Sequence, residues 1–204
     1  MDWPRVVFHI LESGIPSCIL NSRIKNGAML KTQDVVVAGY LACYGGQGAW
    51  TFSRLGEALG MSASQVHGAV ERGSTCLLLS NGSDAPWGVQ RKNLFTLCVH
   101  GLRFVFPAQL GAESRGMVTA QAAPLFRQLF VDQGQAGPVW PDAEGDARGP
   151  SLEPLHRSAL AGVKKAPDKR FYELLCCIEV LRCGQARERA IAEGLLRKRL
   201  LSHG

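Results

Sequence analysis

The sequence has no apolar run as long as the roughly 18–20 residues that a membrane-spanning helix needs. Its first residues, MDWPRVVFHILESG, lack the basic start and the sustained apolar core of a secretory signal. Hydrophobic residues make up 46% of the chain and charged residues 20%, a balance that argues against a wholly disordered chain. We therefore expect a folded, cytoplasmic protein that does not enter a membrane.

Catalytic and phosphate-binding motifs are missing too: there is no G-x-S-x-G, P-loop, G-x-G-x-x-G or H-E-x-x-H. His100 lies in an apolar stretch without a second histidine or acid at a metal-binding spacing. The WPD string at 140–142 has no phosphatase nucleophile loop beside it, and the alternating acids at 142–146 do not complete a calcium loop. We expect no catalytic residue, metal or cofactor. An active site assembled only by the fold stays open, because catalytic triads are not local in sequence.

Paired cysteine motifs are absent as well. The seven cysteines are odd in number, and none falls in a C-x-x-C pair. Several lie in apolar helical runs, which predicts reduced, buried thiols in a cytosolic protein. A redox switch at Cys176, Cys177 or Cys183 is the alternative interpretation.

The strongest structural pattern that is present lies in the second quarter of the chain. Thr51 or Ser53 is a candidate N-cap for a short helix, and Gly60 can adopt the left-handed conformation that ends it. Ser62, with Gln65 three residues later, forms a capping box that starts a second helix. Two helices joined by a short turn that contains glycine predict a helix-turn-helix.

In such a unit the second helix enters the major groove of DNA, with its N-terminal residues leading. Gln65 and Arg72 are residue types that make bidentate base contacts, whereas Arg54, Arg91 and Lys92 are expected to hold the phosphate backbone. The complete set of candidate DNA-binding residues is Arg54, Ser62, Ser64, Gln65, His67, Gly68, Arg72, Arg91 and Lys92.

Two features oppose this interpretation. Glu71 is an acid close to the expected path of the phosphates, and the second helix is not strongly basic. The alternative is an ordinary helical hairpin inside an all-α core, in which Gln65 only caps the helix.

The flanking segments supply the remaining parts of a winged helix-turn-helix. Residues 32–45 are apolar nearly all round and predict a buried first helix, capped by Thr32. Residues 76–80 suit a strand, 81–88 are rich in turn formers, and Arg91 and Lys92 follow on the expected return strand. An exposed loop is the alternative to this wing. Residues 93–106 have the apolar spacing of a central helix.

The strings LKTQDVVVAGYLACYG and WTFSRLGEALGMSASQVHGAVERG resemble the winged helix-turn-helix of bacterial MarR-like regulators. The later strings VHGLRFVFP, RGMVTAQAAP, VWPDAEGDARG and LEPLH resemble a bacterial family of small DNA-binding proteins whose back half has no assigned chemistry. The resemblance covers residues 30–204. It implies a mainly α fold with a small β-wing plus C-terminal helices, and a role in transcription regulation.

We divide the chain into an N-terminal extension (1–29), a winged helix-turn-helix domain (30–106) and a C-terminal region (107–204). Met29 directly precedes LKTQD, where the familiar pattern begins, and one hypothesis is that translation starts there, so that residues 1–28 are not part of the native protein. In the C-terminal region we expect loop or short helix at 107–124, a loop around a short VW strand at 134–150, and two helices from 171 onward. Such helices are a natural device for homodimerisation.

The net charge of +6 favours an anionic partner, and its distribution is uneven. Residues 164–204 carry ten basic and five acidic side chains, so +5, whereas residues 47–106 carry five and three, so +2. The basic tail either meets phosphates or is a solvated helix face. The function we expect is sequence-specific binding of double-stranded DNA by a homodimeric regulator. The alternative is a protein-interaction module, antitoxin-like or a regulatory subunit, on the same scaffold.

Overall fold

A computed structural model describes residues 29–46, 50–80, 88–130 and 136–202. The N-terminal extension with its alternative start, and the tip of the expected wing, lie outside the described residues. The described part is mainly helical, with a two-stranded hairpin and a separate three-stranded sheet. This confirms the prediction of a mainly α chain with a small β component. Within the described residues, no helix combines the length and the apolar character that a membrane crossing requires.

The helices are α2 (Thr32–Tyr44), α3 (Phe52–Leu59), α4 (Ala63–Thr75), α5 (Arg91–Thr96), α6 (Leu102–Val105), α7 (Arg157–Lys165), α8 (Arg170–Cys183) and α9 (Ala186–Leu201). The strands are β1 (Leu79–Ser80), β2 (Gly88–Val89), β3 (Leu110–Val118), β4 (Val139–Pro141) and β5 (Ala147–Leu152). A π-helical turn, Leu97–Gly101, joins α5 to α6, and two short 3-10 turns, Ala120–Ala122 and Pro124–Phe126, follow β3.

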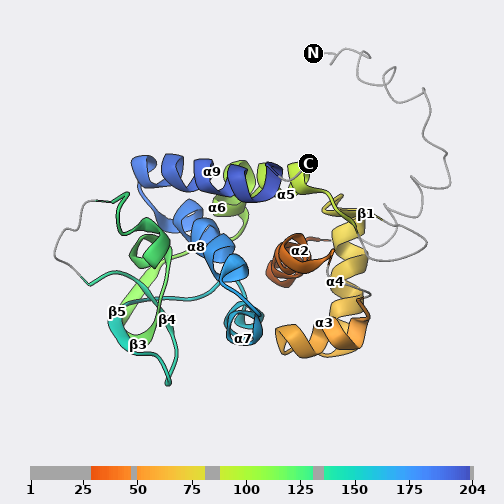
Figure 1. The fold of residues 1–204 in the computed structure, drawn as a ribbon, viewed down its shortest axis with the longest axis horizontal. Helices are drawn as coiled ribbons and strands as arrows, with labels where there is room; N and C mark the ends of the chain where they lie inside the picture. The colour runs from red at the N-terminus through yellow and green to blue at the C-terminus, as the bar shows by residue number, and fades with distance from the viewer. Residues whose placement is uncertain (1–28, 47–49, 81–87, 131–135, 203–204) are drawn as a thin grey trace, which may run out of the picture.

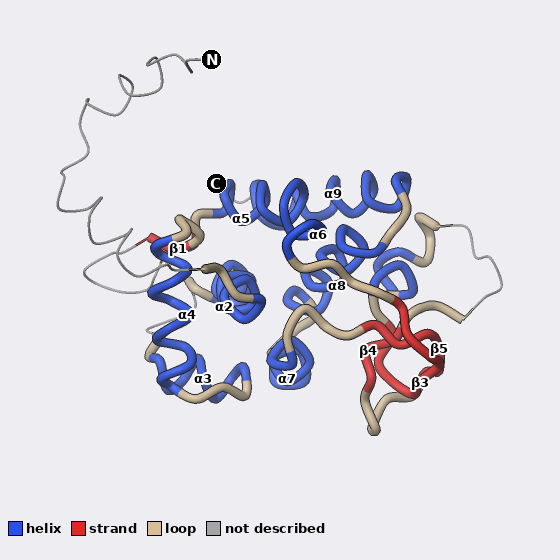
Figure 2. The backbone as a smooth tube through the Cα atoms, turned by 180° about the vertical axis from the view of Figure 1, so that it is seen from behind, coloured by secondary structure: helices blue, strands red, loops and turns tan. Residues whose placement is uncertain are grey.

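Helix α2 lies at the centre of the first half of the chain. Its side chains from Val35 to Leu41 are buried almost completely, as the all-round apolar sequence predicted. The N-cap is Lys31 rather than Thr32, because the Asp34 carboxylate accepts a hydrogen bond from the Lys31 N–H at 2.8 Å. Helix α4 packs on one side of α2 and α8 on another, and α3 packs against α4 and α7 (Figures 1 and 2).

The segment after α6 differs from the sequence expectation. Residues 110–118, predicted as loop or short helix, form the nine-residue strand β3, which pairs antiparallel with both β4 and β5. A single parallel pairing, Val139 with Ser151, closes the three strands into a small barrel. Gly116 permits the closure, because a Cβ atom there would overlap the Trp140 carbonyl oxygen. Only the VW strand of this unit was predicted correctly.

The barrel is attached to α8 by buried polar groups. The Leu155 N–H donates to the Glu179 carboxylate at 2.9 Å, and the same carboxylate pairs with Arg182. Arg182 Nε donates in turn to the Phe106 carbonyl oxygen at 3.0 Å. Burial raises the pKa of the Glu179 carboxyl. These contacts place the barrel at the end of the molecule opposite α3 and α4 (Figure 1).

The two expected C-terminal helices are present as α8 and α9, and α7 precedes them. Helix α8 is buried along most of its length, whereas α9 lies across it at the surface (Figure 1). The C-terminal end of α9 reaches α5, close to the hairpin, in both views (Figures 1 and 2). The C-terminal region therefore packs directly against the elements of the first half.

Candidate nucleic-acid interface

The α3–turn–α4 unit has the local geometry that its sequence predicted. The Arg54 N–H donates to Thr51 Oγ1 at 3.1 Å, so Thr51 is the N-cap of α3. Gly60 has a φ of 63°, the left-handed conformation that ends the helix. Ser62 and Gln65 form both hydrogen bonds of the capping box, at 3.2 Å and 2.9 Å. The turn between the two helices is thereby fixed by local bonds at both ends.

Helix α4 is divided into an inner and an outer face. Val66, Ala69 and Val70 are buried against the core, and Gly73 lies against the side chain of Leu79. The outward residues in the N-terminal half are exposed or half-buried: Ala63, Ser64, Gln65, His67 and Gly68. These side chains are small or polar, so another surface can approach the helix closely.

Arg72 does not lie on that outer face. Its guanidinium donates two hydrogen bonds to the Asp34 carboxylate, from Nε at 2.9 Å and from Nη2 at 2.7 Å. The Asp34 side chain is completely buried, and that of Arg72 is 20% exposed. This bidentate ion pair joins the C-terminal half of α4 to the first turn of α2. The guanidinium is therefore bonded to Asp34 rather than turned outward, where a base contact was predicted, because a buried carboxylate needs a counter-charge.

Gln65 has two roles to reconcile. Its side-chain oxygen accepts the Ser62 N–H in the capping box, which uses one of the two lone pairs of that oxygen. The side chain is nevertheless exposed at the start of α4. A base contact by Gln65 must therefore be made while the cap is kept, which restricts the orientation of its amide.

His67 is the largest side chain on the outer face of α4. Its ring meets the ring of Phe52 edge-on, with the centroids 4.9 Å apart, and its Nδ1 lies 3.6 Å from a Glu71 oxygen. Phe52 is the first residue of α3, so the imidazole is held between the two helices of the unit. This ring contact could not be predicted from local sequence patterns, because it joins residues fifteen positions apart.

The hairpin after α4 corresponds to the predicted wing in place but not in extent. Strand β1 begins at Leu79 rather than at residue 76 and pairs antiparallel with β2. Arg91 and Lys92 lie in the first turn of α5, not on the return strand as predicted. Arg91 donates from Nη2 to the Ala42 carbonyl oxygen at 2.7 Å, so its guanidinium is bonded inside the fold rather than turned outward, as the predicted contact with the DNA backbone would require. Lys92 is exposed.

Arg54 lies on α3 rather than on α4. Its guanidinium carbon is 5.1 Å from the centroid of the Trp50 ring, a cation–π arrangement. It borders a pocket of about 580 Å³ that also meets Lys165 and Pro167. Tyr40 and Tyr44 in the wall of this pocket are almost fully buried, so their rings offer little surface to a ligand.

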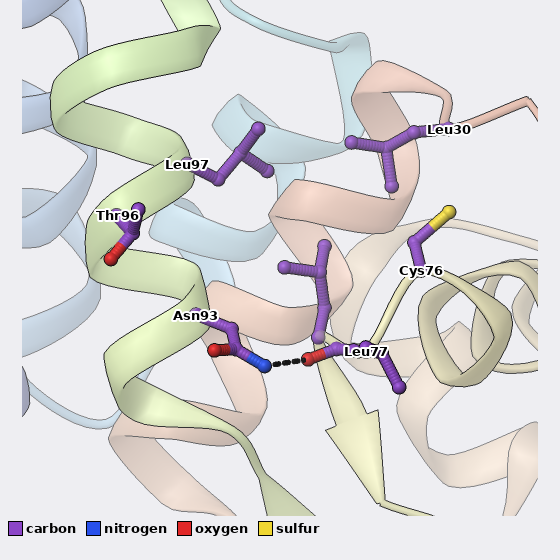
Figure 3. A pocket seen from close by; sticks show the side chains of 7 residues that line it. Leu30, Cys76, Leu77, Asn93, Thr96 and Leu97 are labelled. Carbon is purple, nitrogen blue, oxygen red and sulfur yellow. Dashed lines mark hydrogen bonds between the residues drawn. The ribbon is translucent and has the colours of Figure 1, made fainter. Parts of the chain in front are cut away.

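A second, apolar groove of about 410 Å³ lies between the start of α2, the end of α4 and α5 (Figure 3). Leu77 on its rim has a φ of 59°, which is strained for a leucine, and its side chain is 51% exposed. The Asn93 amide donates to the Leu77 carbonyl oxygen at 2.8 Å and holds this turn (Figure 3). The remaining lining residues are Leu30, Cys76, Leu78, Thr96 and Leu97.

The cysteines of the described residues form no disulfide bond with one another. Burial raises the pKa of Cys98, Cys177 and Cys183 to about 12, and that of Cys176 higher still. The nucleophilic thiolate is therefore scarce at neutral pH, which argues against the alternative of a redox switch at these positions. The described residues contain no group of three or more side chains suited to hold a metal ion.

No family model, curated protein sequence or solved structure matches this chain.

Proposed function

We propose that the protein is a sequence-specific binder of double-stranded DNA and acts as a transcriptional regulator, with α4 inserted in the major groove. The observation that carries the proposal is the outer face of α4: a capped helix start with small and polar exposed residues, placed after a left-handed glycine turn. The order α2, α3, α4, hairpin is that of a winged helix-turn-helix, and the resemblance to MarR-like regulators supports the same proposal.

The proposed roles follow from position. Ser64 and His67 face the base edges, while Ala63 and Gly68 keep the helix narrow enough to approach them. Ser62 Oγ accepts the Gln65 N–H and thereby caps the start of the helix. The hydrogen bonds between Ser62 and Gln65 orient the start of α4, but they make no contact with bases themselves.

The backbone contacts are few on this proposal. Arg72 and Arg91 are bonded inside the protein, so the proposal assigns phosphate contacts to Lys92 and to Arg54, whose guanidinium lies over the Trp50 ring. Two phosphate contacts per subunit correspond to a slope of log affinity against log salt of about −1.8. A homodimer, which matches two half-sites of a palindromic operator, doubles that value.

A specific observation favours the second candidate, a protein-interaction module. Within the described residues, the outer face of α4 presents no lysine or arginine, and Glu71 on the same helix is exposed. The absence of cations and the presence of an acid suit a protein partner better than a polyanion.

Binding to mixed-sequence and genomic DNA fragments, measured against salt, distinguishes the two candidates. DNA binding predicts measurable affinity at ~50 mM salt and a log-linear loss as salt rises. A folded protein that binds none of the fragments at ~50 mM salt contradicts DNA binding and leaves the interaction module.

A further inference from the structure

We propose that the C-terminal end of α9 forms a second phosphate-contacting surface beside the hairpin, made of Arg197 and Lys198 next to Lys92 of α5. This inference rests on the proposed DNA-binding function and extends its footprint. On this inference, basic residues near the C-terminus contact phosphates of the same duplex whose bases α4 contacts, on the side where the hairpin lies.

The fold fixes the end of α9 against the start of α5. Arg91 donates from Nη1 to the Leu200 carbonyl oxygen at 3.5 Å and from Nη2 to that of Ala42 at 2.7 Å, so it bridges α9 and α2. The guanidinium of Arg197 lies over the Phe95 ring, 4.6 Å from its centroid. The two helix ends therefore meet through specific contacts rather than through loose surface packing.

The same place adjoins the hairpin. The Gln90 N–H donates to the Leu78 carbonyl oxygen at 2.9 Å, which ties the residue before α5 to the residue before β1. In both views the C-terminal end of α9 lies beside α5 and close to β1, at the C-terminal end of α4 (Figures 1 and 2). A duplex that runs along α4 and past the hairpin meets this end of α9 next.

The charges on this surface are mainly uncompensated. Lys92, Arg197 and Lys198 are all exposed, and within the described residues Lys92 and Lys198 form no ion pair. Arg197 pairs with Glu193 at 3.1 Å, an exposed i, i+4 pair of the kind that contributes little and yields readily to a phosphate. Three cations against one carboxylate leave a local charge of +2.

The neighbouring Arg199 shows the contrast. It donates to the Glu173 carboxylate on α8 at 2.6 Å and is half-buried, so it holds α9 against the body of the protein. Arg187 is an exposed residue in the first turn of α9, and that end of the helix lies far from the hairpin (Figure 1). Helix α9 thus contains two arginines bonded within the protein, Arg189 and Arg199, two exposed cations near its C-terminal end, and the distant Arg187, which serves as a control.

A solvated helix face is the competing explanation for these cations. A second phosphate-contacting surface is favoured because Arg72 and Arg91, two of the arginines between α2 and α6, are bonded to groups inside the protein. Two phosphate contacts per subunit are few beside the roughly six to ten contacts of a protein whose DNA affinity falls steeply with salt. Arg197 and Lys198 raise the expected number to four and the slope per subunit from about −1.8 to about −3.6.

The test is the salt dependence of binding to a long mixed-sequence duplex, because non-specific binding reports phosphate contacts without base readout. The full-length Arg197→Gln/Lys198→Gln variant is compared with wild type and with Arg187→Gln, which removes the same kind of charge from the far end of α9. The double variant is expected to flatten the slope by about 1.8 per subunit, and Lys198→Gln alone by about 0.9, with Arg187→Gln unchanged.

Three outcomes overturn the inference. If the double variant and Arg187→Gln have the same slope, α9 is a solvated face while the proposed function stands. If wild type binds no duplex at ~50 mM salt, the proposed function fails together with the inference. If the double variant loses binding to anionic lipid vesicles or single-stranded RNA but not to the duplex, the surface serves another polyanion. The single variant Lys198→Gln keeps the contact between Arg197 and the Phe95 ring. If the double variant does not fold, the salt dependence of Lys198→Gln alone still tests the inference.

Discussion

Replacing Arg72 with methionine is expected to destabilise the protein more than replacing Asp34 with asparagine. Arg72→Met leaves the Asp34 carboxylate fully buried, with the Lys31 N–H as its remaining described hydrogen-bond donor. Removing one partner of a buried ion pair costs about 3–5 kcal/mol. Asp34→Asn removes the buried charge, and the Arg72 side chain, already 20% exposed, turns to water. The loss is then that of a charged hydrogen bond, about 1–3 kcal/mol.

Thermal and urea unfolding measure the difference. At roughly 2–4 °C per kcal/mol for a chain of this size, Arg72→Met should lower Tm by on the order of 10 °C. The double variant Arg72→Met/Asp34→Leu should recover part of that loss, because it removes both charges. The reasoning is refuted if Arg72→Met has the same Tm as wild type, or if Asp34→Asn lowers the Tm more than Arg72→Met does. Below its melting transition, Arg72→Met should keep the DNA base preference of wild type, since the guanidinium faces Asp34 and not the groove.

Three further predictions follow from single groups. Ser62→Ala removes the N-cap of α4 and should cost about 1 kcal/mol in urea unfolding, whereas Ser64→Ala, at an exposed position of the same first turn, should not. The Arg170 guanidinium holds the pKa of Asp168 at about 2, so wild type should be more stable than Asp168→Asn at neutral pH. This difference in stability should disappear as the pH falls from about 4 to about 2. Acid-unfolding curves that are equal for the two proteins would contradict this prediction. Iodoacetamide at neutral pH should leave Cys98 unlabelled in the folded protein and label it in denaturant, as mass spectrometry of the peptides can show.

The local structure of the helix-turn-helix could be predicted from the sequence because its determinants are local. A cap, a left-handed glycine and a capping box each involve residues within a few positions of one another, and Thr51, Gly60 and Ser62 all behave as their types predict. The inward stripe of α4 follows from helical spacing alone. Element type is reliable wherever short-range chemistry and periodicity agree.

Arg72 and Arg91 show what could not be predicted. Both were assigned outward roles from residue type and helical position, but each is bonded to a group more than 35 positions away. Asp34 gave a partial signal, since a carboxylate in the first turn of an otherwise apolar helix needs a counter-charge once that helix is buried. The sequence did not say which arginine supplies it.

Strand β3 was missed for a different reason. Residues 110–118 are rich in small and polar side chains, and most of them remain exposed in the folded chain. Their extended conformation is stabilised by pairing with β4 and β5, which come more than twenty residues later. A strand that depends on distant backbone partners leaves little pattern in its own sequence.

The base preference of α4 tests the central claim most directly. Wild type, His67→Ala and Ser64→Ala are used to select duplexes from a randomised pool at fixed salt, with Arg187→Gln as the control. Wild type is expected to enrich one palindromic site, and the two α4 variants to lose preference at defined positions of that site, while the control enriches the same site as wild type. If wild type enriches a site that both α4 variants enrich identically, the exposed face of α4 does not read the DNA.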